Sequence, residues 1–120
     1  MGYRIVRTAA LDRDLDLIFE HLLDSYLALN ADDSDAFDRA VARLNAIHGS
    51  MERLITPPHQ GTLREELGAG IRQVTKDKAI FYFTVHEDVE EVRVLAAFYG
   101  GQDHKRHMLK RLLGEGEGDE

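Results

Sequence analysis

The spacing of apolar residues changes along the chain, and each spacing predicts a kind of element. Residues 3–8 have the two-residue alternation of a strand. From Leu11 onward, apolar residues recur every three or four positions, which predicts an amphipathic helix. The stripe of this helix is Leu11, Leu15, Ile18, Leu22, Tyr26 and Leu29, widened by Phe19 and Leu23. Three acids near its start, Asp12, Asp14 and Asp16, suit the positive end of the helix dipole.

A second helical stripe follows a short polar turn. Residues 30–34 are too few and too polar for anything but a turn, and the next helix can be capped by Asp32, Asp33 or Ser34. The second stripe is Phe37, Ala40, Val41, Leu44, Ile47, Met51 and Leu54. Pro57 and Pro58 must stop this helix, because proline lacks an amide hydrogen and clashes with the preceding turn. Two adjacent amphipathic helices predict an antiparallel hairpin whose apolar side covers a sheet.

The second half of the chain has the pattern of a β-meander. Residues 71–75, 80–85 and 92–99 are β-branched or aromatic runs separated by charged turns, as antiparallel strands require. The preceding residues 59–70 predict a loop with turn signals at its glycines. Residues 62–65 have capping-box spacing, so we expect at most a single helical turn there.

The last predicted strand leads into a turn and a basic helix. Gly100 and Gly101 permit a sharp turn, and Asp103 is suited to cap a helix over residues 104–113. The apolar face of that helix is Met108, Leu109, Leu112 and Leu113, and the cations take the other face. Residues 114–120 are a low-complexity acidic tail that we expect to be disordered.

These elements predict one α+β domain over residues 1–113, in the order β-α-α-β-β-β-α, with a helical hairpin packed on a small, mainly antiparallel sheet. The chain has 120 residues, 43% of them hydrophobic, which is enough for one modest core. It has no cysteine, which excludes disulfides and thiolate chemistry.

No apolar run approaches the roughly 20 residues that span a membrane, and the N-terminus lacks the apolar stretch of a signal peptide. We therefore expect a cytoplasmic protein.

The net charge of −7 is unevenly distributed. Residues 9–56 hold ten acids against four bases, whereas residues 102–113 hold four bases against one acid. Affinity for nucleic acid comes largely from neutralised phosphate charges, so an acidic protein gains little from bulk attraction. The distribution argues against direct nucleic-acid binding and leaves one local basic patch.

Four features of the sequence occur together in one known group of proteins. They are the order of the elements, the glycine and arginine that open a strand within residues 66–72, the aromatic strand at residues 81–83, and the last strand running from Phe98 into Asp103. With these features the chain resembles the RelE/ParE superfamily of toxins from type II toxin–antitoxin modules, over nearly all of residues 3–113. The resemblance implies the RelE/ParE-like fold, a toxin function and a cognate antitoxin partner that wraps the toxin.

Two branches of the superfamily imply two mechanisms. RelE-like members are ribosome-dependent endoribonucleases that cleave mRNA with basic and aromatic residues, whereas ParE-like members lack that set and inhibit DNA gyrase by binding it. The chain resembles the ParE branch more closely, because no lysine cluster precedes Arg72. The equivalent region carries Arg64, Glu65 and Glu66. A non-toxic interaction module of the same fold is a further alternative.

The resemblance implies candidate residues under each mechanism. For an endoribonuclease, the catalytic candidates are Arg72, Tyr99, His104 and Arg106. For a gyrase-binding toxin, the residues expected to contact the target or the antitoxin are Arg72, Arg93, Tyr99, Gln102, Asp103, His104, Lys105 and Arg106. The ParE interpretation predicts neither catalysis nor a cofactor.

Purely structural roles compete with these assignments. Arg72 and Arg93 have the alternative of projecting from the solvent face and pairing with acids such as Glu91 or Glu66. Such pairs are common on sheet surfaces and need no ligand.

Histidines and aromatic residues also have a structural interpretation. His104 and His107 are three positions apart, but no nearby side chain completes a ligand set, so we expect no metal site. Tyr82 and Phe98 are expected to fill the core.

Overall fold

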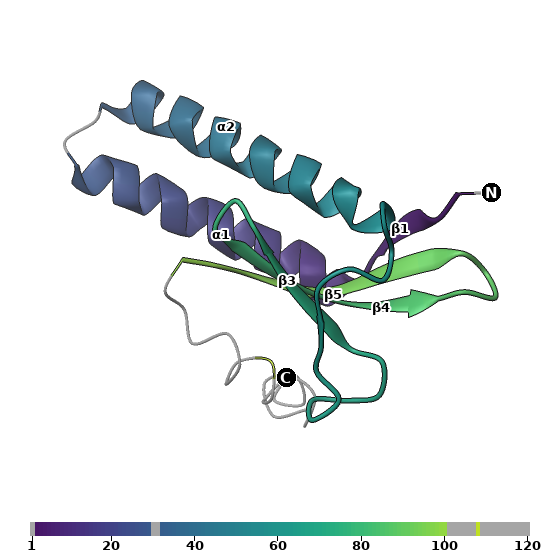
Figure 1. Ribbon diagram of the computed structural model, residues 1–120. Helices are drawn as coiled ribbons and strands as arrows, with labels where there is room; N and C mark the ends of the chain where they lie inside the picture. The colour runs from purple at the N-terminus through teal and green to yellow at the C-terminus, as the bar shows by residue number, and fades with distance from the viewer. Residues whose placement is uncertain (1, 30–31, 101–107, 109–120) are drawn as a thin grey trace.

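The computed structural model describes residues 2–29, 32–100 and 108, in which two helices lie on one side of a five-stranded sheet (Figure 1). The helices are α1 (Ala9–Ala28) and α2 (Asp33–Glu52), followed by the 3₁₀ turn η1 (Arg53–Ile55). The strands are β1 (Arg4–Arg7), β2 (Thr62–Leu63), β3 (Arg72–Lys76), β4 (Ala79–His86) and β5 (Glu91–Tyr99). Their order across the sheet is β1-β5-β4-β3-β2, with β1 parallel to β5 and the other neighbours antiparallel. The predicted α+β class, with a helical hairpin on a mainly antiparallel sheet, is therefore confirmed.

Some of the expected C-terminal features lie outside the described residues. These are the helix over residues 104–113, its Asp103 cap and the acidic tail of residues 114–120. Met108 is the exception, because it is described, helical and fully buried.

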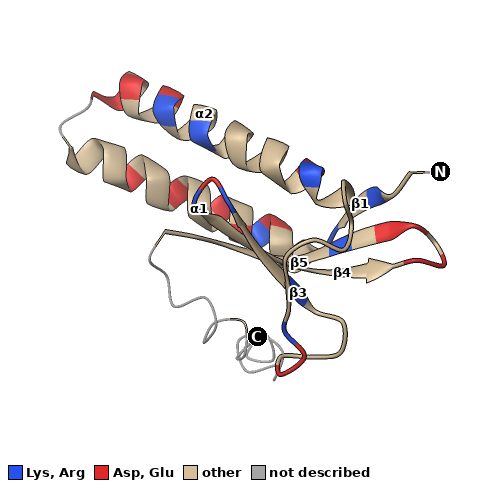
Figure 2. Cartoon of the chain, viewed as in Figure 1, with Lys and Arg blue, Asp and Glu red and all other residues tan. Residues whose placement is uncertain are grey.

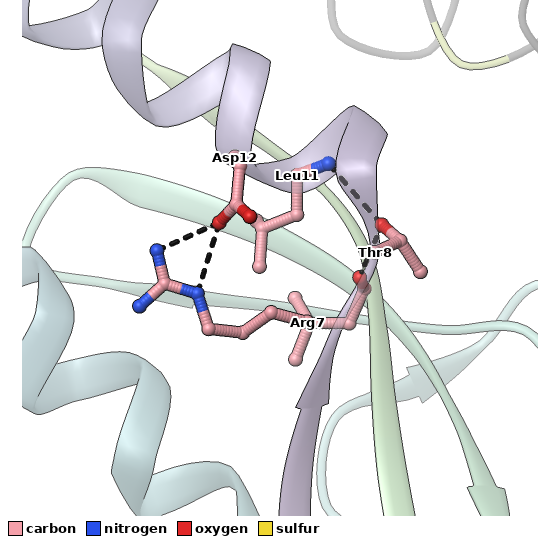
Figure 3. Close-up of polar contacts among 5 residues, drawn as sticks. Arg7, Thr8, Leu11 and Asp12 are labelled. Carbon is pink, nitrogen blue, oxygen red and sulfur yellow. Dashed lines mark hydrogen bonds and ion pairs between the residues drawn. The ribbon is translucent and has the colours of Figure 1, made fainter.

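Helix α1 begins at a threonine cap that also ties it to the sheet. The Thr8 hydroxyl accepts a hydrogen bond from the Leu11 amide at 3.2 Å and donates one to the carbonyl of Val94 in β5 at 2.9 Å (Figure 3). Beside this cap, Nε and Nη2 of Arg7 contact Oδ1 of Asp12 at 3.0 and 2.7 Å. The helix therefore starts two residues before Leu11, because the cap rather than the first apolar residue sets its boundary.

Helix α2 is capped by Asp32, one of the three predicted candidates. Its carboxylate accepts a hydrogen bond from the Asp35 amide at 2.7 Å. The buried residues of α2 are Ala36, Ala40, Ile47, Ser50 and Met51. Phe37, which belongs to the expected apolar stripe, is only half covered, and its ring meets that of Phe19 edge-on at 5.7 Å. The α-helix ends at Glu52, and η1 carries the chain toward the two prolines.

The end of α2 holds the turn between β3 and β4. Asp77 and Lys78 have φ angles of 52° and 66°, in the left-handed region that residues other than glycine adopt uncommonly. The Asp77 carboxylate accepts a hydrogen bond from the Ser50 hydroxyl and lies 3.6 Å from Nη2 of Arg53. The charged turn expected after residue 75 is therefore present, and contacts from the helix hold its unusual backbone in place.

The prediction of a loop over residues 59–70 missed a short edge strand. Thr62 and Leu63 pair with β3 as strand β2, where at most a helical turn was expected. Gly61 permits this close approach, because its φ is 81° and a Cβ there would lie 2.5 Å from the carbonyl oxygen of Gln73. A strand of two exposed residues has no apolar periodicity, so the sequence pattern could not indicate it.

Candidate functional site: the open face of the sheet

The two faces of the sheet have different neighbours. Alternate residues of a strand point to opposite faces. The strand residues that form the core with α1 and α2 are Ala79, Phe81, Phe83, Val92, Val94 and Ala97. We call the opposite face the open face; on β4 and β5 it carries Ile80, Tyr82, Thr84, His86, Glu91, Arg93, Ala96 and Phe98. The two helices do not cover the open face, although its residues Ile80, Tyr82, Ala96 and Phe98 are buried.

One half of the open face is a second apolar cluster. It consists of Ile71, Ile80, Tyr82, Ala96, Phe98 and Met108, with Leu67 and Leu95 packed against it. The rings of Tyr82 and Phe98 meet edge-on with centroids 6.1 Å apart, and burial raises the pKa of the Tyr82 hydroxyl. The expectation that these two aromatic residues fill the core is confirmed.

A bulge in β5 separates this apolar half from the other half of the open face. The register of β4 and β5 shifts between Tyr82 and Phe83, so that Leu95 has no directly opposite partner on β4. A carboxylate of α1 stabilises the bulge from the covered side: Oδ2 of the buried Asp14 accepts a hydrogen bond from the Ala97 amide at 3.0 Å. The sequence suggested only a dipole role for Asp14, whereas the structure gives it an inward-facing one.

The other half of the open face, which we call the polar half, is built from three strands. The register places one row of residues across β1, β5 and β4, namely Arg4, Glu91 and His86. The next row is Val6, Arg93 and Thr84. Side chains opposite each other on neighbouring strands are close enough to interact. The blue of β1 and the red of the β4–β5 turn and the start of β5 mark this end of the sheet in Figure 2.

Glu91 lies at the centre of the polar half and binds both neighbouring arginines. Its Oε1 accepts a hydrogen bond from Nε of Arg93 at 3.0 Å and lies 3.0 Å from Nη2 of the same residue, and its Oε2 accepts a hydrogen bond from Nη2 of Arg4. The Glu91 side chain is only 11% exposed, whereas that of Arg4 is 70% exposed. The hydrogen bonds from Arg93 and then Arg4 hold the pKa of the Glu91 carboxyl below its usual value, so the group is ionised at neutral pH.

The remaining polar groups of this surface are also hydrogen-bonded. The Thr84 hydroxyl lies 2.9 Å from Nε2 of His86. Nearer the sheet edge, Nε of Arg64 donates to Oε1 of Gln73 at 2.8 Å, and Nη1 of Arg64 lies 3.9 Å from a carboxylate oxygen of Glu66. In the polar half, two arginines are thus held by a single carboxylate, and the Thr84 hydroxyl is paired with the His86 ring.

Arg72, the residue common to both expected sets, lies on the covered face of the sheet. It pairs with the core residue Phe83 in β4, and its Nη1 donates to the carbonyl of His59 at 3.1 Å. The expected ion pair with Glu66 is not formed by Arg72, because its guanidinium turns to the loop after η1. Arg93, in contrast, makes the expected pair with Glu91.

Tyr99 lies at the end of β5, also on the covered face. It pairs with Ala79, the first residue of β4, whereas Arg72 pairs with Phe83, four positions further along that strand. The Tyr99 ring faces that of His21 in α1, with centroids 6.4 Å apart. The other expected residues, Gln102, Asp103, His104, Lys105 and Arg106, lie outside the described residues. The structure thus does not bring Arg72, Arg93 and Tyr99 together.

Sequence reasoning missed the contributions of Arg4 and His86 to this surface. Alternation in residues 3–8 places Arg4 and Val6 on one face of a strand, which was a usable signal. The partner of that strand was not predictable, because Arg4 and Glu91 are 87 positions apart and meet only through parallel pairing of β1 with β5. Glu91 itself was expected only as an ion-pair partner of Arg72 or Arg93.

Two further properties concern the described part of the chain. None of its helices combines the length and the apolar character needed to cross a bilayer. Within residues 2–29, 32–100 and 108, no three acidic or histidine side chains gather closely enough to hold a metal ion.

The chain is similar in fold to solved structures but matches no family model. No protein-family model and no curated protein matches the chain. Among solved structures, a chain of the chromosomal ParDE toxin–antitoxin system from P. aeruginosa is similar with a TM-score of 0.61 and 21% sequence identity, over 82% of this chain and 96% of that chain. A chain of the toxin–antitoxin complex RelBE2 from Mycobacterium tuberculosis is similar with a TM-score of 0.56 and 15% identity, over 85% of this chain and 95% of that chain.

Both similarities extend over nearly the whole of the matched chains, and at these identities they concern the fold. The chain has the α+β fold found in ParDE and RelBE2 toxin–antitoxin systems. The RelE/ParE-like architecture expected from the sequence is thereby confirmed.

Proposed function

We propose that this protein is the toxin of a type II toxin–antitoxin system, of the ParE kind, which inhibits DNA gyrase by binding it and is neutralised by a cognate antitoxin. The observation that carries the proposal is the similarity in fold to a chain of the ParDE system over 82% of this chain. Function does not follow from fold alone, so the proposal also depends on the side chains of the open face.

The arrangement of the open face favours a binding role over an endoribonuclease. A ribonuclease needs cations free to stabilise a pentavalent phosphate and a group that moves a proton. Arg93 and Arg4 are both bound to Glu91, and Arg72 and Tyr99 lie on the covered face, where their β4 partners Phe83 and Ala79 are four positions apart. These positions give a phosphate no cluster of free cations among the described residues of the open face.

The helical hairpin offers the antitoxin an apolar surface. Leu17, Leu29 and Phe37 are 60%, 72% and 50% exposed, respectively. Antitoxin segments that are disordered when free can gain affinity by burying such residues. The expected contact residues Arg72, Arg93, Tyr99, Gln102, Asp103, His104, Lys105 and Arg106 remain predictions for the target or the antitoxin. A gyrase target implies a cytoplasmic location.

A supercoiling assay tests the target. Relaxed plasmid, gyrase and ATP are incubated with micromolar toxin, and we expect supercoiling to fall and to recover when the antitoxin is added. Arg93→Ala should weaken inhibition, because Arg93 lies on the proposed contact surface. Arg39→Ala is the matched control, since Arg39 forms its ion pair with Asp35 within α2 and away from the open face. Unchanged supercoiling at micromolar toxin would remove the gyrase target and leave the fold unaffected.

A translating extract tests the ribonuclease alternative. Transcript cleavage that appears with the protein and disappears in Arg72→Ala or His104→Ala would establish the RelE mechanism in place of the ParE mechanism. Neither cleavage nor inhibition of supercoiling, together with stable binding to the product of a neighbouring small gene, would identify a non-toxic interaction module.

A further inference from the structure

We propose that Arg4 and Arg93 form an anion-binding site whose occupant is the chain's own Glu91, and that this site takes a phosphate-class oxyanion once the Glu91 charge is removed. The proposal does not depend on the toxin function. It rests on the geometry of the polar half, where one carboxylate accepts a hydrogen bond from each of two guanidinium groups and makes a further ion-pair contact with Nη2 of Arg93.

The sheet fixes this geometry in advance of any ligand. Arg4 and Glu91 are directly paired residues of β1 and β5, and Arg93 is two positions further along β5, on the same face. The two guanidinium groups therefore approach the carboxylate from two strands, one at each oxygen. Strand pairing, rather than Glu91, fixes the backbones of Arg4 and Arg93 on neighbouring strands, two positions apart in register, so both arginines stay near this point of the sheet when the carboxylate is neutralised.

The groups around Glu91 suit an oxyanion. Guanidinium groups bind carboxylate and phosphate through parallel hydrogen bonds, and both kinds of anion present oxygens with similar spacing. His86 is directly opposite Glu91 in β4, and Thr84 is directly opposite Arg93. These residues add ring and hydroxyl donors beside the two arginines. Without the Glu91 charge, the polar half holds two positive charges with no anion between them.

In the native protein the site is closed. The Glu91 side chain is 89% covered, and because it belongs to the same chain it binds the arginines without the loss of translational and rotational freedom that a free ligand undergoes. The hydrogen bonds that hold it also keep its pKa below the usual range. An external phosphate would have to displace an intramolecular ligand that is ionised at neutral pH. Glu91 therefore makes this end of the sheet selective against phosphate, although the cations for binding it are present.

The test compares phosphate binding by the wild type and by Glu91→Gln, which keeps an acceptor oxygen and removes the charge. Inorganic phosphate is titrated by calorimetry at constant ionic strength, and a labelled single-stranded oligoribonucleotide is titrated by fluorescence anisotropy. We expect the variant to bind at least about tenfold more tightly than the wild type, because an ion within a few ångströms dominates the local potential. Tighter binding of inorganic phosphate alone identifies a free-phosphate site, and tighter binding of both probes identifies a site open to phosphodiesters.

Two controls separate the site from a change in net charge. Asp88→Asn removes the same charge from the exposed β4–β5 turn and should leave binding unchanged. Adding Arg93→Gln to Glu91→Gln should abolish the gain. An equal gain in Asp88→Asn, or no gain in Glu91→Gln, would overturn the proposal.

A thermal measurement covers the case in which Glu91→Gln is poorly stable. A ligand that binds only the folded state raises the melting temperature of a destabilised protein as it does that of a stable one. Phosphate at fixed ionic strength should raise the melting temperature of Glu91→Gln more than that of the wild type or Asp88→Asn. Equal shifts in all three proteins would contradict the site.

Discussion

The covered face and the open face of the sheet are made by the same strands but differ in what they are built to do. On the covered face, Phe81, Phe83 and Val94 are fully buried beneath the helices. On the open face, the same strands change from the buried Tyr82 and Phe98 to the ion pairs around Glu91. Burial stabilises in proportion to apolar area, whereas partly exposed ion pairs contribute little. The covered face and the apolar half of the open face are therefore responsible for stability, and the polar half of the open face is free to vary with function.

The largest expected effect on stability comes from removing a buried ring from the covered face. Phe81→Ala removes a fully buried ring and should lower the free energy of unfolding by about 3–5 kcal/mol. Thr84→Ala in the same strand removes one hydrogen bond with His86 on the polar half and should cost about 1 kcal/mol or less. Chemical denaturation of both variants measures the difference. Similar losses would mean that the two faces do not divide stability and binding between them.

A buried polar residue of α1, Asp14, tests whether single hydrogen bonds to the covered face also contribute to stability. Asp14→Ala leaves the buried Ala97 amide of the bulge without its carboxylate acceptor and should cost about 1–3 kcal/mol. Asp14→Asn keeps an acceptor oxygen and should cost less, which denaturant titration will show. If the alanine and asparagine variants lose equal stability, the charge of Asp14 matters rather than its hydrogen bond to the bulge.

In the hairpin that joins β3 and β4, one substitution is expected to raise stability. Lys78 has a φ of 66°, which glycine adopts without steric cost, so Lys78→Gly should raise stability by about 0.5 kcal/mol. Lys76→Gly, in the extended backbone of β3, is the matched control and should lose about 0.5–1 kcal/mol. Melting temperatures of the two variants should move in opposite directions. A loss in Lys78→Gly would show that the lysine side chain stabilises the turn.

The smallest expected effect is a pH dependence from the helical side. Burial lowers the pKa of His48 in α2, and the charge of Arg7 lowers it further, against the weaker influence of Glu52 and Asp12. Below about pH 6.5 the unfolded chain therefore binds a proton that the folded protein resists, and stability falls as the pH falls. His48→Gln should flatten this decline between pH 7.5 and 5.5, as followed by thermal denaturation. His21→Gln, on α1, is the control, and an equal flattening in both would exclude His48 as the cause.

Periodicity predicted the elements that bury many residues and failed where single contacts decide. The two helices and four of the five strands follow from apolar spacing, because burial of a repeated face selects one conformation. Strand β2 depends on the close approach that Gly61 permits, and the start of α1 depends on Thr8. Neither of these leaves a periodic signal, because each rests on one residue.

The site was harder to predict than the fold, because its residues come from distant parts of the chain. Arg93 and Glu91 lie two positions apart, and their pairing was foreseen. Arg4 joins them only through the parallel pairing of β1 with β5, which no local pattern specifies. Arg72 has the residue type of a site but is directed by β3 to the loop carbonyls on the covered face.

The parallel pairing of β1 with β5 has a consequence for synthesis of the chain. The ribosome makes β1 first and its partner β5 last among the described strands. Of these strands, β5 is the one on which α1 chiefly packs. The nascent helical hairpin therefore emerges with its apolar stripe uncovered and waits for most of the chain before it can be buried. Contacts between such distant segments slow folding and leave incomplete chains prone to aggregate. A chain that stops before residue 91 thus has β2, β3 and β4 but lacks β5, the strand that β1 pairs with and α1 packs on, so α1 cannot be buried as in the complete fold.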